Sequence, residues 1–225
     1  MHYLKIIVMF FFLSISKSSI AFQVSTLYKI IENKDSYITL TGNSEREFIY
    51  TSLSQIKVDN NGELKESTLS PEYISKWPVI VEPGEIILNG NEEVRVKITK
   101  NIERLFEDQV IGLSFIPDIL DKKNSNADIK IAMGYKTWLF IPGESDLKGD
   151  VYTTRDKNTI FINNKTNKIL MLNIDDKNSK TNTPTFGDVI FSLPGTKKSI
   201  NVENKVKIFF HTLNNNQEKI KEVTL

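Results

Sequence analysis

The sequence predicts an all-β chain made of two β-sandwich domains. Apolar and polar residues alternate over many short segments, and no window of about 11 residues carries a helical stripe of apolar side chains. Turn signals separate these segments at intervals of about 8–12 residues, which is the spacing of sandwich strands. The chain of 225 residues is long for one sandwich and long enough for two.

Period-two alternation marks the individual strands of the first predicted domain. Val94, Val96 and Ile98 alternate with polar residues, which predicts a half-buried strand. Residues 110–115 form another predicted strand, which ends before Pro117. The longest strand-like stretch is 129–141, and its first alternate apolar positions are Ile129, Ile131, Met133 and Tyr135.

A proline–glycine turn divides the chain. Residues 142–145 read Pro-Gly-Glu-Ser directly after the long strand, which is typical of a domain boundary. A second series of strand-like segments follows, including 159–162, 169–174, 189–193 and 206–210. We therefore predict one sandwich over 22–141 and a smaller one over 144–225.

The first 21 residues are predicted to be a cleaved signal peptide. Lys5 precedes an unbroken apolar run over 6–13, and Ser19 and Ala21 are small residues at the positions that a signal peptidase reads. The run is much shorter than the roughly 20 residues needed to cross a bilayer. We expect an exported protein in the periplasm without stable membrane insertion.

Composition argues against several classes of partner and cofactor. Removing Lys5 and Lys17 with the signal peptide leaves 27 of the 29 basic residues against 28 acidic ones, so no nucleic-acid partner is expected. The chain has no cysteine, which excludes disulfides and thiolate zinc sites. The only histidine outside the signal peptide, His211, has no nucleophile motif near it. We expect no cofactor, no metal site and no enzymatic activity.

Three segments of the first predicted domain resemble the PapD-like periplasmic pilus chaperones. Residues 77–96 read WPVIVEPGEIILNGNEEVRV, which is similar to the family's proline, apolar strand, glycine turn and following strand. Residues 106–117 look like the family's F1 strand with its closing Ile-Pro, and 129–142 fall where the family has its subunit-binding G1 strand. Residues 26–31 look like its first strand.

The resemblance implies a fold and a function. It implies two immunoglobulin-like domains set at an angle, with pilus or fimbrial subunits and an outer-membrane usher as partners. The G1 strand, here with Ile129, Ile131, Met133 and Tyr135, would complete the unfinished sandwich of a subunit. This donor-strand complementation supplies backbone hydrogen bonds and apolar side chains that cover an otherwise exposed edge and groove.

Basic residues of the family's interdomain cleft hold the C-terminal carboxylate of the subunit. Lys29 stands where the family usually has an arginine, and a lysine lacks the bidentate fork of a guanidinium. Lys136 is the nearest candidate for the family's second cleft cation, one or two residues out of register when counted from Pro142. The basic residue that follows the family's G1 aromatics in an interdomain salt bridge is missing here. These differences indicate a divergent member.

Two other functions fit the same pattern of strands. The first is an exported pilus subunit or adhesin, which the two internal strand series disfavour. The second is a carbohydrate-binding β-sandwich that uses Trp77 or Trp138 as a stacking platform.

Overall fold

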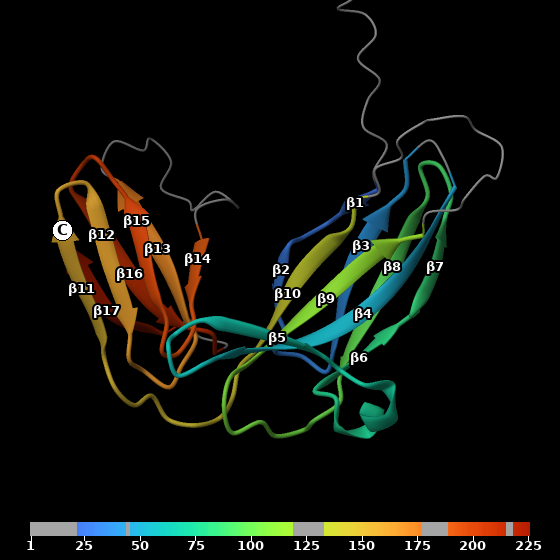
Figure 1. The fold of residues 1–225 in the computed structure, drawn as a ribbon, viewed down its shortest axis with the longest axis horizontal. Coiled ribbons are helices and arrows are strands. Elements are labelled where there is room, and N and C mark those ends of the chain that lie inside the picture. The colour runs from blue at the N-terminus through green and yellow to red at the C-terminus, as the bar shows by residue number, and fades with distance from the viewer. Residues whose placement is uncertain (1–21, 44–45, 119–132, 177–188, 215–217) are drawn as a thin grey trace, which may run out of the picture.

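The computed structural model describes residues 22–43, 46–118, 133–176, 189–214 and 218–225. They form two β-sandwiches that meet at one end and diverge like the arms of a V (Figure 1). Within these residues the only helix is a short 3-10 helix, η1 (Pro71–Lys76). The all-β prediction and the two-domain sandwich architecture are therefore confirmed. The predicted signal peptide, 1–21, lies outside the described residues.

The first domain contains strands β1 to β10. Their bounds are β1 (Gln23–Val24), β2 (Tyr28–Ile30), β3 (Asp35–Thr41), β4 (Glu47–Val58), β5 (Leu64–Thr68), β6 (Val79–Glu82), β7 (Glu85–Leu88), β8 (Glu93–Lys100), β9 (Gln109–Pro117) and β10 (Tyr135–Ile141). One sheet has the order β1-β3-β8-β6, and the other has the order β2-β10-β9-β4-β5 with β7 also paired to β4. β2 runs parallel to β10, so the chain between β1 and β2 passes from the edge of one sheet to the edge of the other.

Alternation along the strands explains the core of this domain. Val96 and Ile98 of β8 face Ile111, Leu113 and Phe115 of β9 from the opposite sheet, and all five are fully buried. Residues two apart in a strand point to the same side, so one face of each strand packs into the core. The other face of the β9 sheet is called the outer face below.

The second domain repeats this architecture with seven strands among the described residues. They are β11 (Val151–Asp156), β12 (Thr159–Asn164), β13 (Leu170–Asp176), β14 (Val189–Ser192), β15 (Lys197–Asn201), β16 (Val206–Thr212) and β17 (Lys219–Thr224). Their sheets have the orders β11-β12-β15 and β14-β13-β16-β17. Ile160, Ile162, Leu172, Ile208 and Phe210 are central to the core between them.

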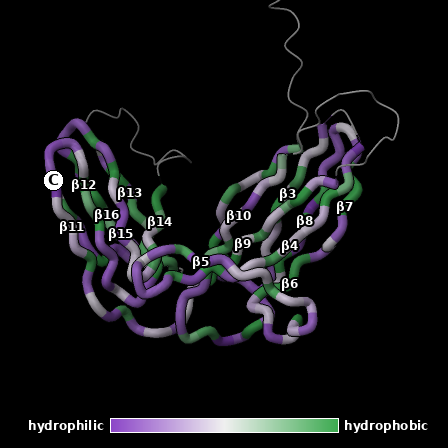
Figure 2. The backbone as a smooth tube through the Cα atoms, viewed as in Figure 1, coloured by the Kyte–Doolittle hydropathy of each residue, from purple (hydrophilic) through white to green (hydrophobic). Residues whose placement is uncertain are grey.

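A third apolar cluster joins the domains. This interdomain cluster takes residues from both sandwiches: Ile56, Val110, Phe140, Ile169, Met171, Leu193 and Leu213. Phe140 stacks on Phe191 of β14 with ring centroids 4.1 Å apart, and Tyr28 meets Phe191 edge-on at 4.9 Å. Hydrophobic and hydrophilic residues alternate along the strands of both sandwiches, and hydrophilic residues are frequent in the turns and in the linker (Figure 2).

Candidate binding cleft

Strand β10 holds the described part of the predicted donor segment. Ile129 and Ile131 lie outside the described residues, so their role stays a prediction. Met133 precedes β10 and is 49% exposed, whereas Tyr135 is half-buried. β10 pairs with β9 along its whole length, but its recorded pairing with β2 covers only Trp138, Leu139 and Phe140. The start of β10 therefore has a partner strand on one side only among the described residues.

Tyr135 belongs to the inner face of β10. Its ring meets Phe22 edge-on, with centroids 5.1 Å apart, and it packs against the core of the first domain. Thr137, Leu139 and Ile141 share this face and are buried. Of the four residues in the predicted donor row (Ile129, Ile131, Met133 and Tyr135), Tyr135 therefore packs into the core of its own domain. Met133 is the exposed one of the two that the structure describes.

Lys136 lies on the outer face of β10, together with Trp138 and Phe140. Its ammonium donates a hydrogen bond to Oε1 of Glu66 on β5, and the two side chains are 34% and 45% exposed. The same oxygen accepts a 2.6 Å hydrogen bond from the hydroxyl of Ser54 on β4. Lys136 and Ser54 lower the pKa of the Glu66 carboxyl below its ordinary value, because both donate to its charged form.

Lys29 lies on the opposite side of the sheet from Lys136. In the parallel pairing of β2 with β10, Lys29 stands beside Leu139, which is buried in the core of the first domain. Its neighbours Tyr28 and Ile30 pack against the interdomain cluster instead. Because paired residues in adjacent strands point to the same face, Lys29 and Lys136 do not converge on one point. Both assignments as carboxylate ligands remain predictions.

The two tryptophans of the carbohydrate alternative are engaged in packing. Trp77 packs against the first core, and its indole N–H donates a 3.0 Å hydrogen bond to the Ser70 carbonyl oxygen. Trp138 packs against the interdomain cluster. Both side chains are half-buried.

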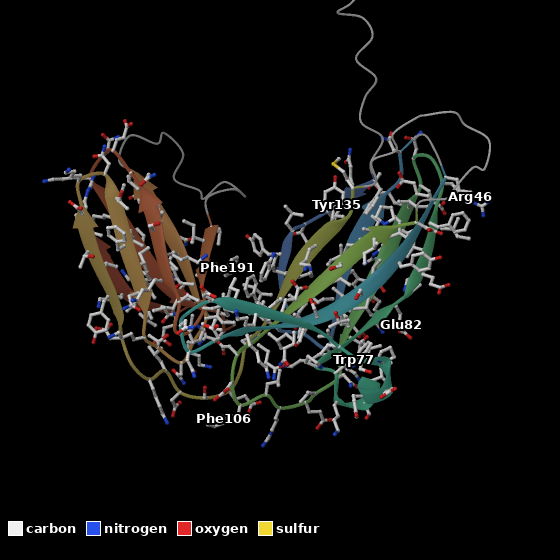
Figure 3. The ribbon with its side chains drawn as sticks, viewed as in Figure 1. Arg46, Trp77, Glu82, Phe106, Tyr135 and Phe191 are labelled. Carbon is white, nitrogen blue, oxygen red and sulfur yellow. The ribbon has the colours of Figure 1, made fainter. Side chains whose placement is uncertain are left out.

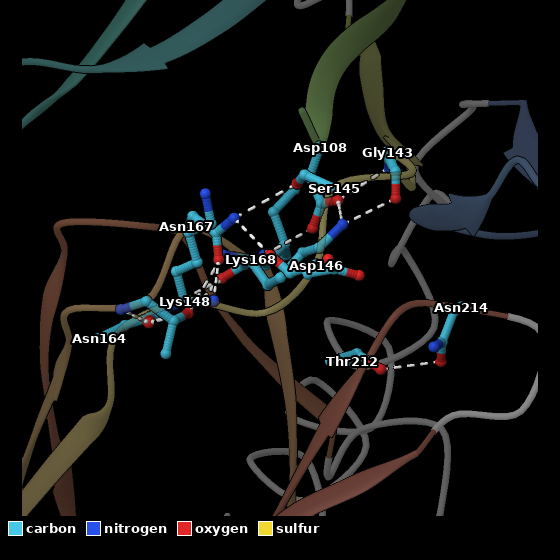
Figure 4. A network of polar contacts seen from close by, with 12 residues as sticks. Asp108, Gly143, Ser145, Asp146, Lys148, Asn164, Asn167, Lys168, Thr212 and Asn214 are labelled. Carbon is cyan, nitrogen blue, oxygen red and sulfur yellow. Dashed lines mark hydrogen bonds and ion pairs between the residues drawn. The ribbon is translucent and has the colours of Figure 1, made fainter. Parts of the chain in front are cut away.

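A buried ion pair crosses the junction between the domains (Figure 4). The ammonium of Lys168 lies 3.0 Å from Oδ1 of Asp108, and their side chains are only 9% and 2% exposed. Asp108 also accepts backbone N–H bonds from Gly143 at 2.8 Å and from Ile169 at 2.7 Å. Lys168 donates a further bond of 2.7 Å to the carbonyl of Gly143. The sequence lacks the basic residue that forms the family's interdomain salt bridge. Here Asp108 and Lys168, at other positions, form an ion pair between the domains.

Sequence reasoning missed Asp108, Lys168 and Glu66. Asp108 precedes a predicted strand and Lys168 precedes another, so each reads as an ordinary solvated charge at a strand end. Glu66 lies in a segment without apolar alternation, Leu64–Thr68, in which every residue is exposed. No local signal could have placed Glu66 beside Lys136, since the two residues are 70 positions apart.

Two interdomain cavities flank Asp108. One, of about 440 Å³, lies between β4 and the β14–β15 turn and is lined by Ile56, Val58, Ile169 and Leu193 among others. The other, of about 580 Å³, lies along the linker and is lined by residues such as Glu144, Asp146 and Leu213. Neither cavity is lined by Lys29 or Lys136.

The described residues offer no assembled metal site and no membrane-spanning helix. No group of three or more His, Asp or Glu side chains among them is placed to hold a metal ion. Within the same residues no helix has the length and apolarity to cross a bilayer. His211 lies on β16 opposite Met171 of β13, inside a sheet.

Comparison with known proteins agrees with this architecture. Residues 24–142 match the family described as CS5 fimbrial protein N-terminal domain. The chain is 32% identical over 200 residues to an Escherichia coli protein described as an uncharacterized 25.9 kDa protein in the CS5 3′ region, with 88% of each chain covered.

Solved structures of fimbrial chaperones have the same fold. A chain from the complex of Salmonella enterica SafA pilin with the SafB chaperone superposes with a TM-score of 0.56 at 10% identity, covering 93% of this chain and 98% of that one. A chain from a chaperone–tip adhesin complex of CFA/I fimbriae biogenesis gives a TM-score of 0.54 at 16% identity, covering 91% and 97%. With two angled sandwiches and a matching first domain, the chain belongs to the CS5 fimbrial protein N-terminal domain family and has the fold of the PapD-like fimbrial chaperones.

Proposed function

We propose that this protein is a periplasmic chaperone for pilus or fimbrial subunits. It would hold each subunit by donor-strand complementation, through β10 and the residues before it, and deliver it to an outer-membrane usher. The observation that carries the proposal is the start of β10, which follows the exposed Met133 and pairs only with β9 among the described residues. Such a strand end can accept a further strand from a partner.

The outer face beside this strand end suits the C-terminal carboxylate of a subunit. Lys136 supplies an ammonium and Ser54 supplies a hydroxyl, and both already bind a carboxylate in the form of Glu66. Trp138 lies two residues further along the same face, next to the interdomain cluster. A subunit whose last strand runs along β10 could end at this point. We infer that Lys136 is the main anchor, while Lys29, on the other face, stays the second candidate.

Two lysine substitutions test the anchor. We expect Lys136→Ala to fold normally, because a half-exposed ion pair contributes about 0–1 kcal/mol. Subunit capture should nevertheless fall about 10-fold or more, since a charge-assisted hydrogen bond contributes about 1.5–3 kcal/mol. Co-purification of subunits from periplasmic extract, with thermal unfolding in parallel, measures both effects.

Lys29→Ala in the same assay decides the role of the other face. Equal losses for both variants would show that each lysine is needed. Unchanged capture by Lys136→Ala would refute the anchor, and a wild-type chain that captures no subunit would refute the chaperone assignment itself.

A further inference from the structure

Glu66 receives two hydrogen bonds on one carboxylate oxygen. The donors are the ammonium of Lys136 and the hydroxyl of Ser54, the latter at 2.6 Å. Ser54 is buried in the sheet, only 4% exposed. The acceptor, in contrast, comes from β5, an edge strand in which all five residues are exposed. The Ser54 hydroxyl is therefore held by the sheet, while the carboxylate can turn away into solvent.

Gly112 on β9 makes this arrangement possible. It lies between Ser54 of β4 and Trp138 of β10 in the sheet. A Cβ atom at this position would lie 2.8 Å from the Ser54 Oγ and 3.3 Å from the Lys136 Cδ. Without that atom, the lysine side chain can cross β9 diagonally and reach Glu66. The glycine thus leaves room for the Lys136 side chain to lie beside the Ser54 hydroxyl.

We propose that Glu66 is an internal stand-in for the carboxylate of a bound subunit. In the free chain it occupies the ammonium of Lys136 and the hydroxyl of Ser54, and an incoming carboxylate displaces it. This inference rests on the proposed function, because it assigns the displaced group to the same site. The exchange replaces one carboxylate by another, so Lys136 keeps a counter-ion before and after capture.

An internal competitor and a positioning residue have opposite effects on binding. If Glu66 occupies the site, only the fraction of molecules with Glu66 turned away can bind, and its removal should tighten capture. If Glu66 instead holds Lys136 in the geometry needed for binding, its removal should weaken capture. The sign of the change therefore separates the two roles.

Glu66→Gln supplies the test, with Glu63→Gln as the matched control. Glu63 lies on the same hairpin and contacts Lys65 at 3.5 Å, away from Lys136. The probe is the subunit that co-purifies with the wild-type chain, and its dissociation constant is measured for each variant. We expect Glu66→Gln to bind it about 3- to 10-fold more tightly, and Glu63→Gln to bind it like wild type.

Trace acetylation with acetic anhydride gives a second readout that needs no subunit. Mass spectrometry should show faster labelling of Lys136 in Glu66→Gln than in wild type, with Lys29 as the internal reference. Weaker or unchanged subunit binding by Glu66→Gln, while Lys136→Ala loses binding, would overturn the stand-in role alone. Binding that Lys136→Ala leaves intact would overturn the carboxylate anchor, and the inference with it.

Discussion

At the scale of single residues, Asp108 carries the tightest polar contact between the domains. Its carboxylate is 2% exposed and is bonded by the Lys168 ammonium and by two backbone N–H groups. A buried ion pair is costly to desolvate, and further hydrogen bonds offset this cost, as those to Gly143 and Ile169 do here. The pair therefore fixes how the linker at Gly143 and the start of β13 approach β9.

Removing one member of this pair should destabilise the fold strongly. We expect Asp108→Ala to lower the free energy of unfolding by about 3–5 kcal/mol, because the Lys168 ammonium would stay buried without its counter-charge. Urea unfolding followed by circular dichroism measures the change. Asp150→Ala is the control, since Asp150 is 54% exposed and its pair with Lys221 should contribute about 1 kcal/mol or less. Equal losses in both variants would contradict the special role of the buried pair.

At the scale of elements, β10 shows what alternation can and cannot predict. The sequence placed a strand ending at Ile141, and the structure has β10 from Tyr135 to Ile141. Period two defines two faces, but it does not say what covers each one. The outer face of β10 packs on residues of the second domain, and the first of these, Ile169, lies more than 25 positions further along the chain. That contact depends on tertiary structure alone.

The relation between Lys29 and Lys136 could not be predicted for a similar reason. Each lysine lies on a predicted strand. Whether the two side chains lie on the same face of the sheet depends on the register of β2 against β10. A shift of one residue would reverse the face. β5 was equally hidden, because Leu64–Thr68 has no alternation and is recognised only by its pairing with β4.

The start of β10 leads to a prediction about the donated strand. Met133→Glu should reduce subunit capture about 10-fold or more, because a charged side chain would enter the apolar groove of the partner. Its own thermal unfolding should change little, since Met133 is already 49% exposed. Ile74→Glu is the matched control, because Ile74 is 50% exposed on η1, away from β10. Retained capture by Met133→Glu, or equal loss in the control, would exclude Met133 from the donor row.

At the scale of the whole molecule, three contacts among the described residues link the two domains. The interdomain cluster supplies apolar packing, and the Asp108–Lys168 pair supplies charge. The third contact joins two turns, since a Cβ on Gly62 would lie 3.0 Å from the Gly195 carbonyl oxygen. Both glycines have positive φ, of 83° and 80°, so these turns come close in a backbone conformation that other residues rarely adopt.

Phe191 makes aromatic contacts between the two domains. It projects from the second domain toward the first, on the inner side of the V (Figure 3), where it stacks on Phe140 and meets Tyr28. Phe191→Ala should lower the stability by about 1–3 kcal/mol, through lost aromatic contacts and lost burial. The loss should fall mainly on the junction, because Phe191 packs against the interdomain cluster.

The Phe191→Ala variant should therefore unfold in two separate urea transitions, and small-angle X-ray scattering should show a larger radius of gyration than for wild type. Subunit capture should weaken as well, because the outer face that carries Lys136 would no longer be held against the second domain. Phe161→Ala is the control: Phe161 is 47% exposed on β12, and it is not part of the interdomain cluster. A single unfolding transition and an unchanged radius in Phe191→Ala would mean that the ion pair and the two glycine turns hold the angle without it.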